Sequence, residues 1–116
     1  MSESNCLFCK IVAGEVPADI VAESDTAIAF RDIAPQAPVH VQVIPRDHYP
    51  NVAAVAAAGD VDVADLFRLA AEVATIEGVA ETGYRLVANT GEHAFQTVMH
   101  AHVHVIGGRP MGWPPG

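Results

Sequence analysis

The sequence predicts an α+β domain in which about five antiparallel strands form one sheet, with one long and one short helix gathered on one side of it. Three observations support this fold class. Several short runs alternate between apolar and polar residues, as half-buried strands do. One stretch, residues 60–77, carries apolar residues at helical spacing. The length of 116 residues suits a single domain, so we expect residues 1–116 to form it, with 107–116 as a C-terminal tail.

The N-terminal part is expected to hold a short helix and a hairpin. Residues 6–13 (CLFCKIVA) place Phe8 and Ile11 on one helical face and are followed by a glycine, which commonly ends a helix. Residues 20–23 and 26–32 are typical of strands, and the short link between them favours a hairpin.

The next segment, residues 39–44 (VHVQVI), follows a loop with two prolines and predicts a third strand. Side chains alternate along a strand, so His40, Gln42 and Ile44 share one face and three valines share the other. The sheet is therefore expected to have one aliphatic face and one largely polar face.

The long helix is expected at residues 60–77, after a weak helical turn at 51–57. Asp60 or Asp62 is available as its N-cap, because a carboxylate there accepts from free backbone N–H groups. The apolar stripe of this helix is Leu66, Leu69, Val73 and Ile76.

Two further strands are predicted at residues 84–89 and 98–106, with a loop between them. The last strand contains the run HAHVHVI, which places His100, His102 and His104 at every second position. A period of two aims all three imidazoles the same way. The opposite face would carry Met99, Ala101, Val103 and Val105.

Composition narrows the function classes. A formal net charge of −8 argues against a polynucleotide partner, since binding a phosphate backbone needs a basic stripe. No apolar run is long enough for a membrane span, and the polar N-terminal residues do not resemble a signal peptide. We therefore expect a cytoplasmic protein whose Cys6 and Cys9 stay reduced or bind a metal.

Three imidazoles on one face have more than one interpretation. They are compatible with a solvated polar face, or with a catalytic zinc site, because two histidines at i, i+2 can bind zinc. We favour nucleophilic catalysis at phosphorus, because a neutral imidazole is a good nucleophile near pH 7. His102 is flanked on both sides and is the expected nucleophile, while His40 lies on the same face of another strand and could approach it.

The run HAHVHVI resembles the signature of the histidine triad (HIT) superfamily, His-φ-His-φ-His-φ-φ with φ apolar, at all seven positions. Four further segments resemble its nucleoside phosphoramidase branch, the histidine triad nucleotide-binding proteins. They are CLFCKIVAGEVPADIVAESD, AFRDIAPQAPVHVQVIPRDH, YRLVANTGE and the closing GGRPMGWPPG. The resemblance thus covers nearly the whole chain.

This resemblance implies hydrolysis of purine nucleoside 5′-phosphoramidates through a nucleotidyl-histidine intermediate. His102 would attack phosphorus, assisted by His104, His100 and His40. Asp32 would accept hydrogen bonds from the ribose hydroxyls, and Phe8, Ile11, Phe30 and Ile33 would form an apolar slot for the base. The full implied nucleotide-binding set is Phe8, Ile11, Phe30, Asp32, Ile33, Asn89, Gln96, Thr97, His102 and His104.

The loop before the triad departs from that branch. A Gly-Gly-Gln-Ser type segment would be expected, and Ala94-Phe95-Gln96-Thr97 stands there instead. Gln96 and Thr97 keep the polar pair, but Phe95 replaces a glycine where a backbone amide would approach phosphate. In the tail, Arg109 and Met111 have counterparts in that branch, and by analogy Trp113 would reach a partner subunit's site.

Cys6 and Cys9 have the C-x-x-C spacing of half a structural zinc site. His48 and His100 are available as the remaining ligands, and prokaryotic-type relatives in the superfamily use such a set. The other interpretation is that both cysteines are simply small buried residues. If His100 binds zinc, it orients the triad through the metal, and catalysis still depends on His102.

The expected protein is thus a phosphoramidase that needs no cofactor for catalysis, carries a structural zinc ion, and forms a homodimer with a shared sheet. Its expected ligand is a purine mononucleotide or a nucleoside phosphoramidate. Two alternatives remain open: a dinucleoside polyphosphate hydrolase of another triad branch, and a nucleotide-binding regulatory protein with vestigial turnover.

Overall fold

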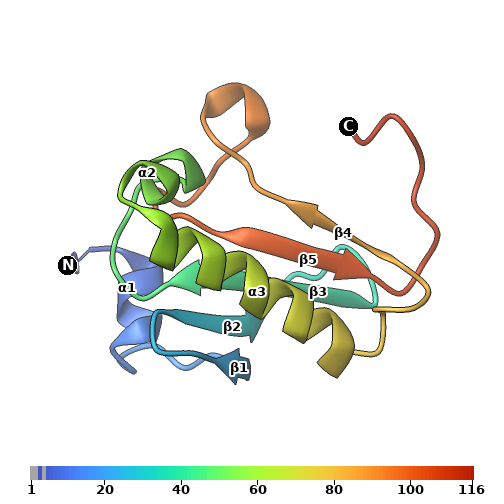
Figure 1. Ribbon diagram of the computed structural model, residues 1–116, viewed down its shortest axis with the longest axis horizontal. Helices are drawn as coiled ribbons and strands as arrows, with labels where there is room; N and C mark the ends of the chain where they lie inside the picture. The colour runs from blue at the N-terminus through green and yellow to red at the C-terminus, as the bar shows by residue number, and fades with distance from the viewer. Residues whose placement is uncertain (1–2, 4) are drawn as a thin grey trace.

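The computed structural model describes residue 3 and residues 5–116. Within them, five strands form one antiparallel sheet in the order β1-β2-β3-β5-β4 (Figure 1), which confirms the predicted fold class. The strands are β1 (Ile20–Glu23), β2 (Ala27–Arg31), β3 (Val39–Pro45), β4 (Tyr84–Val87) and β5 (Val103–Gly107). The helices are α1 (Leu7–Val12), α2 (Val52–Ala57), α3 (Asp60–Ile76) and the 3-10 helix η1 (Glu92–Ala94).

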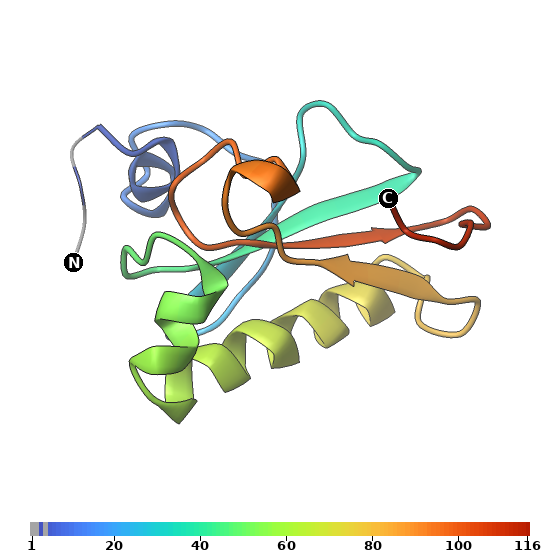
Figure 2. The same cartoon turned by 90° about the horizontal axis from the view of Figure 1, so that it is seen from above.

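The helices do not gather on one side of the sheet, so that prediction is wrong. Figure 2 shows α3 on one side of the sheet and α1 on the other. The reason lies in β2, which is buried on both faces: Ala27 and Ala29 pack in the core under α3, whereas Ile28 and Phe30 pack with Phe8 of α1. The imidazole-bearing face of the sheet is therefore the face that α1 partly covers.

The long helix is placed as predicted, but two of its details differ. Its N-cap is Gly59, with no side-chain cap, so the prediction of Asp60 or Asp62 as N-cap is wrong. Both carboxylates lie in the first turn instead, where they favourably oppose the helix dipole. The predicted apolar stripe is wrong at Ile76, which is 51% exposed, because the core-facing stripe continues through Ala70 and Ala74.

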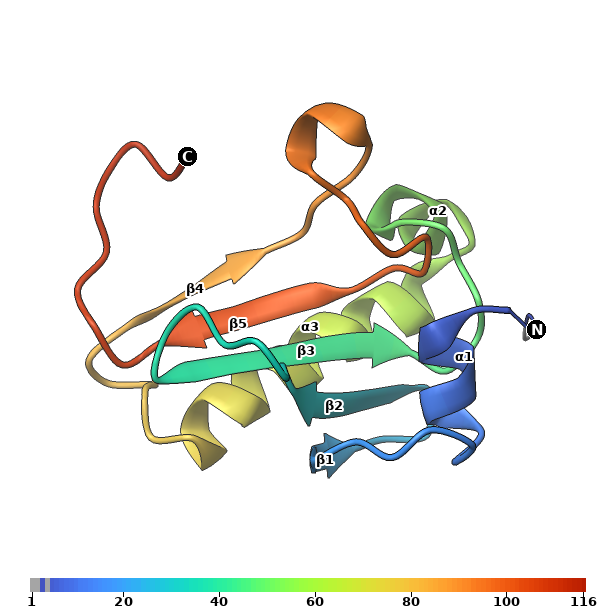
Figure 3. The same ribbon diagram turned by 180° about the vertical axis from the view of Figure 1, so that it is seen from behind.

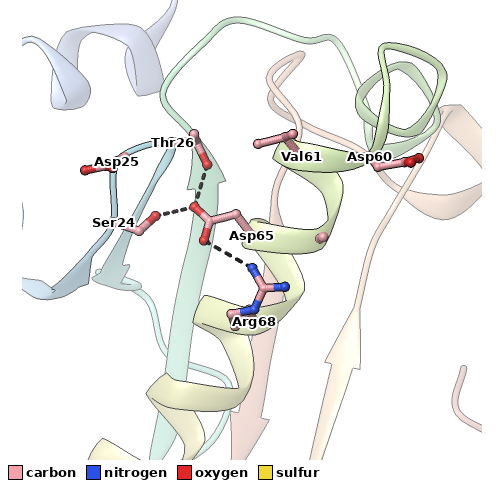
Figure 4. A pocket seen from close by; sticks show the side chains of 8 residues that line it. Ser24, Asp25, Thr26, Asp60, Val61, Asp65 and Arg68 are labelled. Atoms are coloured by element: carbon pink, nitrogen blue, oxygen red, sulfur yellow. Dashed lines mark hydrogen bonds and ion pairs between the residues drawn. The ribbon is translucent and has the colours of Figure 1, made fainter.

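Asp65 ties α3 to the hairpin between β1 and β2. The hydroxyls of Ser24 and Thr26 both donate to Asp65 Oδ2, as Figure 4 shows, and these hydrogen bonds lower the pKa of the carboxyl. Arg68 lies 3.9 Å from the other carboxylate oxygen. The same side chains line an open hollow of about 690 Å³ that includes none of the triad histidines, so we assign this cluster a structural role.

The last strand begins at Val103, so the prediction of a strand from residue 98 is wrong. The register pairs Val43 with Val103, which would place Pro45 opposite Ala101 if the ladder continued. Proline has no N–H to donate, and the Pro45 carbonyl instead faces His100 Nε2 at 2.9 Å. Met99 consequently does not face the core and is 54% exposed. His100 and His102 precede the strand, and only His104 lies within it.

Among the residues that the structure describes, no helix is long and apolar enough to span a membrane.

Candidate functional site

The candidate site lies on the sheet face opposite α3. Figure 3 shows this face, with α1 near the C-terminal end of β3 and the β2–β3 loop near its N-terminal end. Neighbouring strands β3 and β5 pair Gln42 with His104 and His40 with Ile106. His40 and His104 are therefore diagonal neighbours, with His40 Nε2 and His104 Nδ1 2.9 Å apart. The two strands bring together the imidazoles that the sequence placed on one face.

His102 is buried, and its ring orientation is set by the backbone. Its Nδ1 lies 2.7 Å from the carbonyl oxygen of His100. A carbonyl can only accept, so Nδ1 carries the hydrogen of the neutral ring and Nε2 carries the free lone pair. The His102 ring packs edge-on against Phe8 and His104, with centroids 5.3 Å and 5.0 Å away.

The proton positions on the other two imidazoles follow from one loop amide. The backbone N–H of Gln36 donates to His40 Nδ1 at 3.0 Å, so Nδ1 must be the acceptor nitrogen. The hydrogen of neutral His40 is then on Nε2, from which it donates to His104 Nδ1. His104 in turn carries its hydrogen on Nε2. The free lone pair on His102 Nε2 and the Nε2–H donor of His104 thus belong to neighbouring rings, whose centroids lie 5.0 Å apart.

Burial favours the neutral forms of His40 and His104. Desolvation lowers the pKa of His40 below its usual value, although the nearby Asp32 carboxylate opposes that shift. Desolvation also lowers the pKa of His104 to about 4, with further lowering from His102 and His40. At neutral pH, the pair is therefore in the form that the hydrogen-bond chain requires.

Asp32 occupies the start of the β2–β3 loop and is held in a fixed orientation. Its Oδ1 accepts from the Ala34 amide at 2.8 Å, and its Oδ2 accepts from Gln42 Nε2 at 2.9 Å. His40 Nε2 lies 3.4 Å from the same Oδ2. Sequence reasoning put Gln42 on the correct strand face but gave it no role, and it missed the Gln36 amide, which has no side-chain signal.

The predicted base slot is only partly assembled. Phe8 and Phe30 are buried and meet edge to face at 5.5 Å, with Ile11 packed beside them. Ile33 is fully exposed on the loop and free to cover a ligand. Asn89 lies just beyond β4 and is half-buried.

The loop before the triad is anchored by Gln96. Its side chain accepts from the Gly91 amide and donates to the carbonyls of Pro50 and Val98, so a nucleotide would compete with these bonds. Phe95 takes the left-handed conformation expected for a glycine, at φ 60°. Its N–H donates to Glu92 O, and so this amide already has a partner. Thr97 is exposed.

The tail beyond β5 lies over Arg85. The Arg85 guanidinium donates to the Gly112 carbonyl and lies 5.9 Å from the centre of the Trp113 ring. Trp113 is 82% exposed. Its predicted contact with a partner subunit stays a prediction.

The four predicted zinc ligands, Cys6, Cys9, His48 and His100, form one cluster. Nδ1 of His100 lies 3.4 Å from Cys6 Sγ and 3.5 Å from Cys9 Sγ, and Nδ1 of His48 lies 3.4 Å from Cys9 Sγ. Tetrahedral zinc with ordinary Zn–S and Zn–N bonds separates sulfur and nitrogen ligands by about 3.5 Å. The donor atoms therefore fit a zinc ion.

The surroundings of the cluster also suit a metal. The Pro45 carbonyl keeps a hydrogen on Nε2 of His100, which leaves its Nδ1 lone pair free for the ion. Backbone N–H groups of Cys9 and Glu3 donate to the sulfurs of Cys6 and Cys9. Burial raises the pKa of the Cys9 thiol, and the Glu3 N–H bond opposes that shift toward the thiolate, the form of cysteine that binds zinc.

Asp32, His40 and His104 form a second group whose ligand atoms lie within 4.8 Å of one another. Here the hydrogen bonds disfavour a metal. With its Nδ1 occupied by the Gln36 N–H, neutral His40 has its hydrogen on Nε2, the atom that would have to bind the ion. The geometry thus allows a metal ion at the cysteine cluster and favours a hydrogen-bond chain at the triad.

Comparison with known proteins shows the family to which the chain belongs. The family model described as HIT domain matches residues 13–111. The purine nucleoside phosphoramidase of Escherichia coli K12 is 46% identical over 106 residues, which are 91% of this chain and 89% of that protein. The adenylylsulfatase HINT1 of Arabidopsis thaliana is 45% identical over 118 residues, covering 99% of this chain and 79% of that protein.

Among solved structures, a HIT family hydrolase from Legionella pneumophila superposes with a TM-score of 0.91 at 46% identity, covering 97% of this chain and 100% of that chain. The fold and the triad define a histidine triad protein. The chain belongs to the HIT domain family.

Proposed function

We propose that this protein is a nucleotide hydrolase that cleaves purine nucleoside 5′-phosphoramidates through a nucleotidyl-His102 intermediate. The observation that carries the proposal is the 2.7 Å contact between His102 Nδ1 and the His100 carbonyl, which leaves the Nε2 lone pair free to attack phosphorus. The name of the Escherichia coli relative, a purine nucleoside phosphoramidase, supports the substrate class.

In the first step, His102 Nε2 forms a bond to phosphorus as the bond from phosphorus to the amine breaks. The Nε2–H of neutral His104 donates a hydrogen bond to a phosphate oxygen or to the departing amine, which takes its proton from solvent, and His40 steadies His104 through the 2.9 Å contact. In the second step, water attacks phosphorus, its proton passes to the imidazole cluster, and His102 leaves with its lone pair. The intermediate has a P–N bond like that of the substrate, so neither step is steeply uphill.

The remaining side chains would position the nucleotide. Asp32, already oriented by Ala34 and Gln42, has lone pairs left for ribose hydroxyls. Phe8, Phe30 and Ile33 would surround the base, and Asn89 and Thr97 would approach the phosphate.

We further propose that Cys6, Cys9, His48 and His100 hold a structural zinc ion, which would supply folding stability and no bond-making step. The chain is also expected to form a homodimer. Metal analysis of the purified protein and its mass in solution would test these two statements.

Adenylyl sulfate is a second candidate substrate, favoured by the name of the Arabidopsis relative, an adenylylsulfatase. The same attack on phosphorus would then expel sulfate, which needs no proton. Rates of AMP formation from adenosine 5′-phosphoramidate, adenylyl sulfate and diadenosine polyphosphates would rank the candidates.

The test of the nucleophile is His102→Ala. We expect kcat/KM to fall by roughly 100- to 10,000-fold or more while AMP still binds. His93→Ala is the matched control, because His93 is the exposed histidine outside both clusters, and its rate should not change. Comparable turnover by His102→Ala would disprove the assignment.

A further inference from the structure

His100 belongs to both clusters at once. Its imidazole lies among the cysteine sulfurs, with Nδ1 3.4 Å from Cys6 Sγ, while its backbone carbonyl is the group that orients His102. The Pro45 carbonyl holds the other edge of the same ring at 2.9 Å. If a change at the two sulfurs moves the His100 ring, it also acts on the His100 carbonyl, which holds the hydrogen of His102 on Nδ1.

Helix α1 provides a second connection. Phe8 lies in the helix between Cys6, which caps it, and Cys9, which is buried within it. The Phe8 ring packs edge-on against both His100 and His102, at 5.8 Å and 5.3 Å. Movement of the first turn of α1 would shift Phe8 against the nucleophile.

The sulfurs lie close together and one of them is reachable. The ligand atoms of the cluster all lie within 4.8 Å of one another, and the two sulfurs must come together to the disulfide bond length of about 2.05 Å to be joined. A hollow of about 390 Å³ opens onto the cluster and is lined by Cys6, His48, Thr97 and Met99 among others. A small oxidant can enter there.

We propose that Cys6 and Cys9 are a reversible oxidation site, and that their disulfide switches off the hydrolase by withdrawing His100 and Phe8 from His102. The effect on turnover rests on the proposed function, whereas the structural effect does not. The oxidant is a peroxide. One thiol attacks it, breaking the O–O bond to give a sulfenic acid and water; the second thiol displaces water from that sulfur. Two thiols lose two electrons and two protons, and one peroxide becomes two waters.

To test this, the zinc-loaded protein is treated with increasing concentrations of hydrogen peroxide, and four quantities are measured. A chromogenic chelator reports released zinc, and peptide mass reports loss of two hydrogens from the Cys6–Cys9 segment. Nitrogen-15 NMR reports the hydrogen on His102 Nδ1, and adenosine 5′-phosphoramidate reports turnover. We expect zinc release, disulfide formation and loss of the His102 Nδ1–H signal in parallel, with a roughly 10- to 100-fold fall in kcat/KM. Thiol reductant plus zinc should restore all four.

Variants of Met99 and of the cysteines distinguish disulfide formation from oxidation at other residues. Met99→Leu removes the exposed methionine in the hollow and should leave the whole response intact. Cys6→Ser, or Cys9→Ser if the first does not fold, should abolish the reversible component. If the disulfide forms and zinc leaves but the His102 signal is unchanged, the inference is overturned. If untreated protein hydrolyses none of the substrates, the proposed function fails, and the NMR, zinc and mass readouts still decide the coupling.

Discussion

Replacing His40 separates two roles that it could have in the site. It could hold the hydrogen of His104 on Nε2, or it could itself transfer a proton during turnover. His40 is 7% exposed, accepts from the Gln36 amide at 3.0 Å and approaches His104 Nδ1 at 2.9 Å. A glutamine can reproduce both bonds, with its carbonyl oxygen accepting and its N–H donating, yet it cannot transfer a proton at neutral pH.

The structure sets the size of the expected effects. His40→Ala leaves a part-buried amide and a part-buried imidazole nitrogen without partners, at about 1–3 kcal/mol for each group. Water entering the vacated space would offset part of that, so we expect a loss of about 2–4 kcal/mol in the free energy of unfolding. His40→Gln should lose about 1 kcal/mol or less, because both bonds are kept.

The kinetic expectation follows from the hydrogen on His104. With alanine, that hydrogen is free to move to Nδ1, and we expect kcat/KM to fall by roughly 100-fold or more. With glutamine, kcat/KM should stay within about tenfold of the native value. The assays are urea unfolding, steady-state hydrolysis of adenosine 5′-phosphoramidate, and nitrogen-15 NMR of His104. A glutamine variant that is stable yet as slow as alanine would refute the tautomer argument.

Three other predictions address stability. Asp65→Ala should lower the free energy of unfolding by about 2 kcal/mol, measured with urea, because the hydroxyls of Ser24 and Thr26 lose a charged acceptor. An effect near zero would show that these hydrogen bonds do not stabilise the fold. The pKa of His104 is lowered to about 4 in the folded protein, so its contribution to the free energy of unfolding is fully present above pH 6.5 and is lost as pH falls toward 4. Urea unfolding across that pH range should show the native protein losing up to about 3 kcal/mol more stability than His104→Gln. Phe95→Gly should raise stability by about 0.5–1 kcal/mol, since φ of 60° strains a bulky residue, whereas Phe95→Ala should change little.

The parts of the fold that sequence predicted well are those carried by local periodicity. The strand faces around His40 and the stripe through Leu66, Leu69 and Val73 follow from side-chain direction alone, and the structure has them. The position of α1 does not follow in this way. The run Ala27–Phe30 is apolar at every position, a pattern that fits a strand buried on both faces, and that signal could have placed a helix on each side.

The features near the triad that the sequence did not predict depend on contacts that only the folded chain makes. The start of β5 depends on Pro45, whose missing N–H ends the ladder from the neighbouring strand. The hydrogen on His40 depends on the Gln36 amide, which only the folded loop brings to it. The C-x-x-C spacing, by contrast, predicted two of the four members of the Cys/His cluster directly, and the resemblance supplied His48 and His100.

The proposed mechanism depends on His102 Nε2 forming a bond to phosphorus. Rapid quenching of the protein with adenosine 5′-phosphoramidate, followed by peptide mass spectrometry, tests that bond directly. We predict one adenylyl group on the peptide that contains His102, located on that residue by fragmentation and absent from His102→Ala. An adduct on another residue, or full turnover through a variant that cannot form one, would contradict the account.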